Sequence, residues 1–161
     1  MNALPLIHRL FPDARVILAL RHPCDTVFSC YASNFKLNDG MSSFLQLDKA
    51  ADLYDLSFSY FEKARELLEM RVHEIRYENV VEDRERELRS LVGFLGLDWS
   101  DEVLDHESVA LSRGRIKTPS YHQVIQPIYS QSAGRWTRFR KHLEPVLPVL
   151  APWIAKFGYD V

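Results

Sequence analysis

The chain has 161 residues, 47% of them hydrophobic, and a formal net charge of −2, which suits one compact domain with a sizeable core. The near-neutral charge is untypical of nucleic-acid-binding proteins, and no apolar stretch approaches the length that crosses a membrane. Cys24 and Cys30 are too few for a disulfide framework, and no pair of histidines has the spacing of a helical metal site. We therefore expect a cytoplasmic protein that binds no metal, no nucleic acid and no membrane.

The first part of the sequence predicts a helix, a strand and a second helix. Leu4–Leu10 has the pattern of a short amphipathic helix and not of a signal peptide. Val16–Leu20 is an unbroken apolar run, typical of a strand that is buried on both faces of a parallel sheet. Pro23 suits the first position of the next helix, and Asp25 falls in its first turn, on the side away from the apolar face.

The rest of the chain predicts one further strand among helices. The expected elements are a helix at 43–70, a strand at 72–77, helices from about 82 to 95 and at 100–106, 132–142 and 147–157, and an irregular segment at 113–131. Leu56 and Tyr60 fall on the side of the long helix expected to face the core. Strand, helix and strand in this order form a βαβ unit, which predicts a parallel sheet. Because only two clear strands are present, the expected α/β sheet is incomplete.

Two polar side chains follow the first strand. Arg21 ends it, and Ser29 comes eight residues later, on the side of the helix away from its apolar face. Ligands bind at the carboxyl ends of strands in open α/β sheets, and the planar donors of arginine suit phosphate. The segment Ser108–Leu143 has seven cations and no Asp or Glu, which also indicates a local site for an anion. The simpler alternative is that Arg21 and Ser29 only complete a strand-to-helix connection.

Several motifs of this sequence occur together in one known family. They are Arg21-His22-Pro23 followed by Ser29, then Ile75-Arg76-Tyr77-Glu78-Asn79-Val80, then Gln123-Val124-Ile125-Gln126-Pro127, and finally Gly134-Arg135-Trp136. In this order they resemble the sulfotransferase family, above all its tyrosylprotein-type members and the bacterial domains that often follow tetratricopeptide repeats. The resemblance covers nearly the whole chain. It implies a P-loop-type three-layer α/β/α fold that transfers a sulfuryl group from 3′-phosphoadenosine 5′-phosphosulfate (PAPS) to a hydroxyl or amine.

The resemblance also assigns roles to individual residues. It matches Arg21 and Ser29 to the pair that holds the 3′-phosphate, and Tyr77 to a tyrosine beside the adenosine. It matches Ser120 to a serine near the transferred sulfuryl group, where it would stabilise the transition state, and Arg135 to a cation that contacts the phosphates of the donor. Fixed cations and hydroxyl donors suit the charge that develops in such a transfer, so no metal is implied.

The sequence departs from the family pattern in two places. Ser33 stands where the family often has a second arginine, which weakens one phosphate contact or leaves it to another residue. The Gly-rich phosphate loop of the type Pro-Arg-Ser-Gly-Thr is absent, and the acidic general base also belongs to the family's earlier region. We therefore expect residues 1–161 to be a single domain that lacks the N-terminal phosphate-loop strand and helix, is weak or inactive alone, and self-associates where that strand would pair.

Three functions compete at this stage. The first is a PAPS-dependent sulfotransferase domain, for which peptide tyrosine, carbohydrate and small alcohols remain open as acceptors. The second is a non-catalytic relic that keeps the 3′-phosphate half-site and binds a nucleotide or a protein. The third, a P-loop kinase relative, is disfavoured because no Walker lysine or acidic metal ligand at a strand end is evident. His22 and His122 lie beside the matched residues and could act in catalysis, although a polar loop role is simpler.

Overall fold

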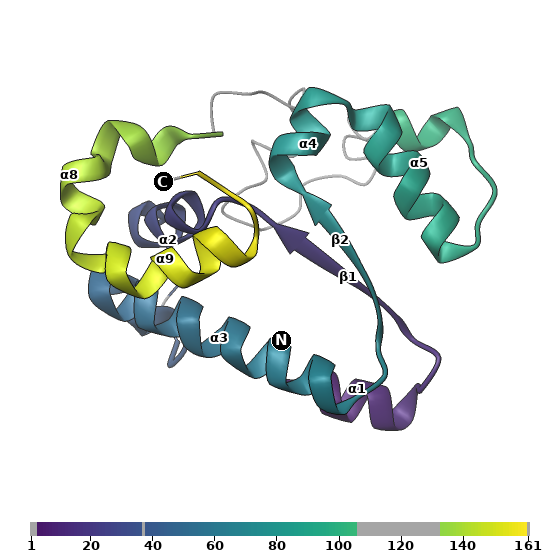
Figure 1. Ribbon diagram of the computed structural model, residues 1–161, viewed down its shortest axis with the longest axis horizontal. Coiled ribbons are helices and arrows are strands. Elements are labelled where there is room, and N and C mark those ends of the chain that lie inside the picture. Colours follow the sequence, from purple (N-terminus) through teal and green to yellow (C-terminus); the bar gives the residue numbers. More distant parts are fainter. Residues whose placement is uncertain (1–2, 37, 106–132, 161) are drawn as a thin grey trace.

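The computed structural model describes residues 3–36, 38–105 and 133–160 and places a small parallel sheet among helices (Figure 1). Strand β1 (Arg15–Leu20) pairs with β2 (Arg71–Arg76) from Arg15 opposite Arg71 to Leu20 opposite Arg76. Between them the chain passes through α2 (Pro23–Ala32), η1 (Met41–Leu45) and α3 (Leu47–Leu67). The two-stranded parallel sheet confirms the pairing predicted for these segments.

The sheet is covered unequally. Figure 1 shows α2, α3 and α9 (Leu147–Lys156) grouped at one side of the two strands. On β1 the buried residues Leu18 and Leu20 alternate with Ile17, which is 44% exposed, and with Ala19, which is also exposed. The prediction that β1 is buried on both faces is therefore wrong within the described part of the chain, because the described helices cover one face and leave the other open.

The core is built around α3 and α9. Phe58 and Phe61 of α3 are buried, and the Phe58 ring lies 5.5 Å from that of Trp153 on α9. The indole Nε1 of Trp153 donates a hydrogen bond of 2.7 Å to Asp55 on the same helix pair. Leu56 and Tyr60, which were expected to face the core, are exposed, because α9 packs against a neighbouring side of α3.

The remaining elements refine the predicted boundaries. They are α1 (Leu4–Leu10), α4 (Tyr77–Glu82), α5 (Arg84–Leu95), η2 (Asp101–Leu104), η4 (Arg135–Phe139), α8 (Arg140–Leu143) and η5 (Glu144–Val146). The helix predicted from about residue 82 is α5, which begins at Arg84. A separate helix that was not predicted, α4, begins at Tyr77 directly after β2. The single helix predicted at 132–142 is a 3-10 turn followed by one short α-helix. The irregular segment predicted at 113–131 lies outside the described residues.

Candidate functional site

The parallel pairing of β1 and β2 brings Arg21 and Tyr77 together. Each residue follows the last residue of its strand, and those last residues, Leu20 and Arg76, are paired. The guanidinium carbon of Arg21 lies 5.1 Å from the centroid of the Tyr77 ring. At this distance a cation attracts the face of an aromatic ring. Two residues that the sequence predicted separately therefore form one contact at the carboxyl end of the sheet.

A pocket of about 310 Å³ opens at this end of the sheet. It is lined by Ala19, Leu20, Arg21, Thr26, Ser29, Cys30, Tyr54, Phe58 and Tyr77. Arg21, Ser29 and Tyr77 are the residues that the family pattern matched to the 3′-phosphate and the adenosine. Among the described residues, the lining offers the guanidinium of Arg21 and several hydroxyl-bearing side chains but no carboxylate, and its other walls are largely apolar. Such a set of donors suits a phosphate monoester attached to an apolar group.

Asp25 is the partner of Arg21 that the sequence analysis missed. Its carboxylate Oδ2 lies 3.8 Å from Nη2 of Arg21, one helical turn earlier in the chain. Asp25 is only 1% exposed, so its predicted position on the solvent side of α2 is wrong. Burial is tolerated because the backbone N–H groups of Gly134 and Trp136 each donate a hydrogen bond of 2.7 Å to it. Because Arg21 precedes α2, the rule for side chains four residues apart on one helix did not apply, and no pattern in the local sequence indicated this pair.

The other predicted residues are placed differently. Arg135 begins η4 and is exposed, and its guanidinium carbon lies 5.5 Å from the centroid of the Phe28 ring. Phe28 precedes Ser29 on α2, so Arg135 is held beside the helix that carries Ser29, although it does not line the pocket. Ser120 and His122 lie outside the described residues, and their predicted roles stay predictions.

His22 is buried and ties the turn after β1 to the C-terminal segment. Its backbone N–H donates to Oε1 of Glu78 at 3.0 Å, and its Nδ1 accepts from the N–H of Cys24 at 3.2 Å. With Nδ1 as an acceptor, Nε2 carries the proton and donates to the carbonyl oxygen of Asp160 at 2.9 Å. The imidazole also stacks on Trp136, with ring centroids 4.8 Å apart. These contacts favour a structural role for His22, as a buried cap of α2.

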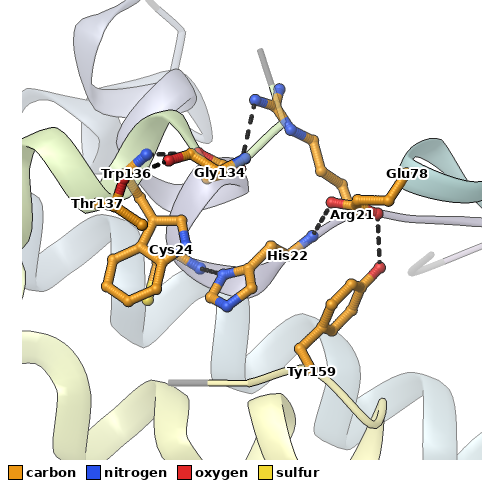
Figure 2. A network of polar contacts seen from close by, with 9 residues as sticks. Arg21, His22, Cys24, Glu78, Gly134, Trp136, Thr137 and Tyr159 are labelled. Carbon is orange, nitrogen blue, oxygen red and sulfur yellow. Dashed lines mark hydrogen bonds and ion pairs between the residues drawn. The ribbon is translucent and has the colours of Figure 1, made fainter. Parts of the chain in front are cut away.

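Glu78 is a second residue that the sequence analysis missed. Its Oε2 accepts a hydrogen bond of 2.9 Å from the hydroxyl of Tyr159, while its Oε1 accepts from His22 (Figure 2). Burial raises the pKa of Tyr159, and the nearby carboxylate of Glu78 raises it further. Glu78 therefore links the turn after β1, which follows Arg21, to the start of α4 and to the C-terminal segment.

The two thiols near the site are poor nucleophiles. Burial raises the pKa of Cys24 to about 12, and the carboxylate of Asp25 adds to the shift while Arg140 opposes it. Burial also raises the pKa of Cys30, where the charge of Arg21 acts in the opposite direction. Since the thiolate is the reactive form, neither group is poised for covalent catalysis at neutral pH.

Metal-binding clusters and membrane-spanning helices are both absent from the described residues. In the ranges 3–36, 38–105 and 133–160, no group of three or more His, Cys, Asp or Glu side chains is placed to hold a metal ion. No helix in the part of the chain that the structure describes is both long and apolar enough to cross a membrane. The guanidinium and the hydroxyl-bearing side chains of the Arg21 pocket suit an anionic ligand.

Comparison with known proteins shows which family this chain resembles. The model of the sulfotransferase family matches residues 1–101 of the chain. An uncharacterized protein of Aquifex aeolicus is 31% identical over 146 residues, which cover 90% of this chain and 19% of that protein. Protein-tyrosine sulfotransferase 1 of Danio rerio is 26% identical over 99% of this chain and 46% of its own length. The human protein of the same name is 26% identical over 99% of this chain and 44% of its own length. The chain thus spans less than half the length of each of these relatives.

Proposed function

This chain belongs to the sulfotransferase family, whose model matches 101 of its 161 residues, and from that premise we propose that it carries the 3′-phosphate half of a PAPS site. The whole reaction would transfer the sulfuryl group of PAPS to a hydroxyl of an acceptor. The observation that supports this proposal most is that the matched residues Arg21 and Ser29 line one pocket together with Tyr77, which is distant from them in the sequence.

Each matched residue would contribute a different interaction with PAPS. The planar guanidinium of Arg21 suits two parallel hydrogen bonds to one phosphate, and the hydroxyl of Ser29 adds a neutral donor. The aromatic ring of Tyr77 offers an apolar face to the nucleoside. Arg135 would add positive charge near the leaving phosphate, where fixed cations stabilise a transition state. Ser120 would do so at the sulfuryl group. PAPS itself supplies the activated sulfuryl group, and the chain supplies binding, orientation and electrostatic stabilisation.

The proposed identity of the acceptor rests on the names of the relatives more than on the described site. Two of the relatives are protein-tyrosine sulfotransferases by name, so a tyrosine hydroxyl of a protein is the acceptor that we propose. Carbohydrate and small alcohols are the alternatives. A second candidate function is a non-catalytic nucleotide-binding or protein-binding relic. Such a relic would need only the 3′-phosphate half-site, whose matched residues Arg21, Ser29 and Tyr77 line one pocket.

Isothermal titration calorimetry on the unaltered chain tests the nucleotide site. We expect adenosine 3′,5′-bisphosphate to bind at least about tenfold more tightly than adenosine 5′-monophosphate, because a charged hydrogen bond contributes roughly 1.5–3 kcal/mol. Equal affinities would contradict the proposal.

An assay with labelled PAPS and tyrosine peptides separates the enzyme from the relic. We expect little or no turnover by this chain alone, because orientation and charge stabilisation of the 5′ half supply most of the rate. Transfer restored by adding a segment with a Gly-rich loop would favour the enzyme. Nucleotide binding without any restored transfer would favour the relic.

A further inference from the structure

The buried carboxylate of Asp25 joins two parts of the chain that both carry cations of the proposed site. Its Oδ2 lies 3.8 Å from Nη2 of Arg21 and accepts a hydrogen bond of 2.7 Å from the N–H of Gly134. Its Oδ1 accepts a second hydrogen bond of 2.7 Å from the N–H of Trp136. The two backbone donors are 109 and 111 residues away in the sequence. One side chain thus fixes the start of η4 against the turn after β1.

The two backbone donors flank Arg135. Gly134 has a φ of 67°, in the left-handed region that favours glycine, and the hydroxyl of Thr137 donates to its carbonyl oxygen at 2.8 Å. These contacts shape the turn that carries Arg135, and Asp25 anchors the turn to α2. The ring of Trp136 then stacks on His22, and the guanidinium of Arg135 lies over Phe28. The direction in which Arg135 leaves the backbone therefore depends on Asp25.

We infer that Asp25 is a positioning residue that holds Arg21 and Arg135 in a fixed relation at the nucleotide site, an inference that rests on the proposed function. Burial of an ionised carboxylate is unfavourable unless hydrogen-bond donors and cations replace the lost water. The carboxylate therefore restricts the positions of those partners. Its negative charge also offsets the repulsion between cations brought to one ligand. Cations fixed in advance stabilise an anion without the cost of reorganisation.

The decisive test is a double-mutant cycle that measures the affinity for adenosine 3′,5′-bisphosphate. Asp25→Asn keeps the size of the side chain but removes its charge and turns one acceptor into a donor that faces an N–H. We expect this change to weaken binding about tenfold. Arg135→Ala should weaken binding about fivefold in the unaltered chain and less than about twofold beside Asp25→Asn, since contacts that depend on each other are not additive. A purely structural Asp25 would leave the two effects additive, which would overturn the inference.

Asp55→Asn is the matched control. Like Asp25, Asp55 is a carboxylate that accepts a hydrogen bond, in this case from the indole of Trp153. It lies on α3 outside the pocket lining, and its change to Asn removes one negative charge, as Asp25→Asn does. We expect the affinity of this variant to stay within about twofold of the unaltered chain, because the described hydrogen bond of Asp55 is to Trp153 and to neither Arg21 nor the turn that carries Arg135. An equal loss in both variants would show a general charge effect and would overturn the inference.

Hydrogen exchange on the unaltered chain keeps the inference testable if Asp25→Asn does not fold. Binding at the Arg21 pocket should slow exchange of the Gly134 and Trp136 amides, because Asp25 connects them to that pocket. Unchanged exchange in the saturated protein would overturn the inference and leave the nucleotide site intact. If the unaltered chain does not prefer the bisphosphate over the monophosphate, the proposed function fails, and the inference fails with it.

Discussion

At the scale of single residues, Ser29 is the neutral partner in the proposed phosphate site. Its hydroxyl lies on α2 and lines the same pocket as Arg21. We expect Ser29→Ala to weaken the binding of adenosine 3′,5′-bisphosphate by about 0.5–1.5 kcal/mol, the usual contribution of one hydrogen bond. Calorimetry measures this directly. Ser59→Ala, at an exposed serine of α3, should change nothing, and an equal loss in both variants would remove Ser29 from the site.

The thiol of Cys30 gives a second measurement at this scale. Cys30 lines the Arg21 pocket, whereas Cys24 is fully buried and its pKa is raised to about 12. Because alkylation requires the thiolate, iodoacetamide at pH 8 should modify Cys30 first and Cys24 very slowly. Saturating adenosine 3′,5′-bisphosphate should then slow the modification of Cys30. Mass spectrometry of the labelled peptides checks both points, and a Cys30 rate that the nucleotide leaves unchanged would place the ligand elsewhere.

The same residues show what the sequence can reveal about a site. Arg21 and Ser29 could be predicted from a strand end and from helical spacing, whereas Tyr77 was predicted only from the resemblance to a family motif. Asp25 and Glu78 could not be identified in the same way. Their partners include backbone N–H groups, which every residue except proline carries, at separations of 109 and 56 residues. Polar groups that are buried through such distant backbone contacts leave no pattern in the local sequence.

At the scale of elements, two glycines of the α5 region have opposite roles. Gly96 ends the helix with a φ of 67°, and a Cβ there would lie 2.7 Å from Nη1 of Arg15. Gly93 lies inside the helix, and a Cβ there would meet nothing within 4 Å. Gly96→Ala should lower the free energy of unfolding by at least about 1 kcal/mol. Gly93→Ala should raise it by about 0.5–1 kcal/mol.

Denaturant unfolding of these two variants is the measurement. The pair controls for the added methyl group, since both changes are Gly to Ala three residues apart. Stabilisation by Gly96→Ala would contradict the left-handed end of α5 and its contact with Arg15.

Elements whose packing is local could be predicted, and those shaped by distant partners could not. The alternation along β1 has one exposed side because helices cover one face, and this depends on how the helices are arranged in space. On α3, apolar residues surround more of the helix than α9 and its neighbours cover, so the pattern alone did not show that Leu56 and Tyr60 are exposed. The turn at η4 depends on Asp25, a residue of another element.

At the scale of the whole molecule, the edge of β1 that does not pair with β2 in the described part of the chain predicts self-association. Within the described part of the chain β1 pairs with β2 alone, and a hollow of about 260 Å³ lies beside it, lined among others by Leu4, Ile17 and Phe61. Unpaired strand edges with apolar side chains favour pairing with another chain. Sedimentation velocity should show a mass that rises with concentration, together with binding of a dye for apolar surfaces.

Ile17→Lys should reduce both signals, because a charge on an edge strand opposes pairing. Leu56→Lys is the control, since Leu56 is 66% exposed but lies on α3, away from the open strand. A stable monomer that binds no dye, or equal effects of the two variants, would count against association through β1.

The claim at the centre of this account is that Arg21 recognises a 3′-phosphate in the pocket at the carboxyl end of β1. The most direct measurement is the ratio of the affinities for adenosine 3′,5′-bisphosphate and adenosine 5′-monophosphate, compared between the unaltered chain, Arg21→Lys and Arg21→Ala. Arg21→Ala should remove about 1.5–3 kcal/mol of the preference, and Arg21→Lys should retain only part of it, because a point charge cannot replace the planar donors. Arg65→Ala, which removes a charge outside the pocket, should leave the ratio unchanged. A preference that persists in full in Arg21→Ala would contradict the claim.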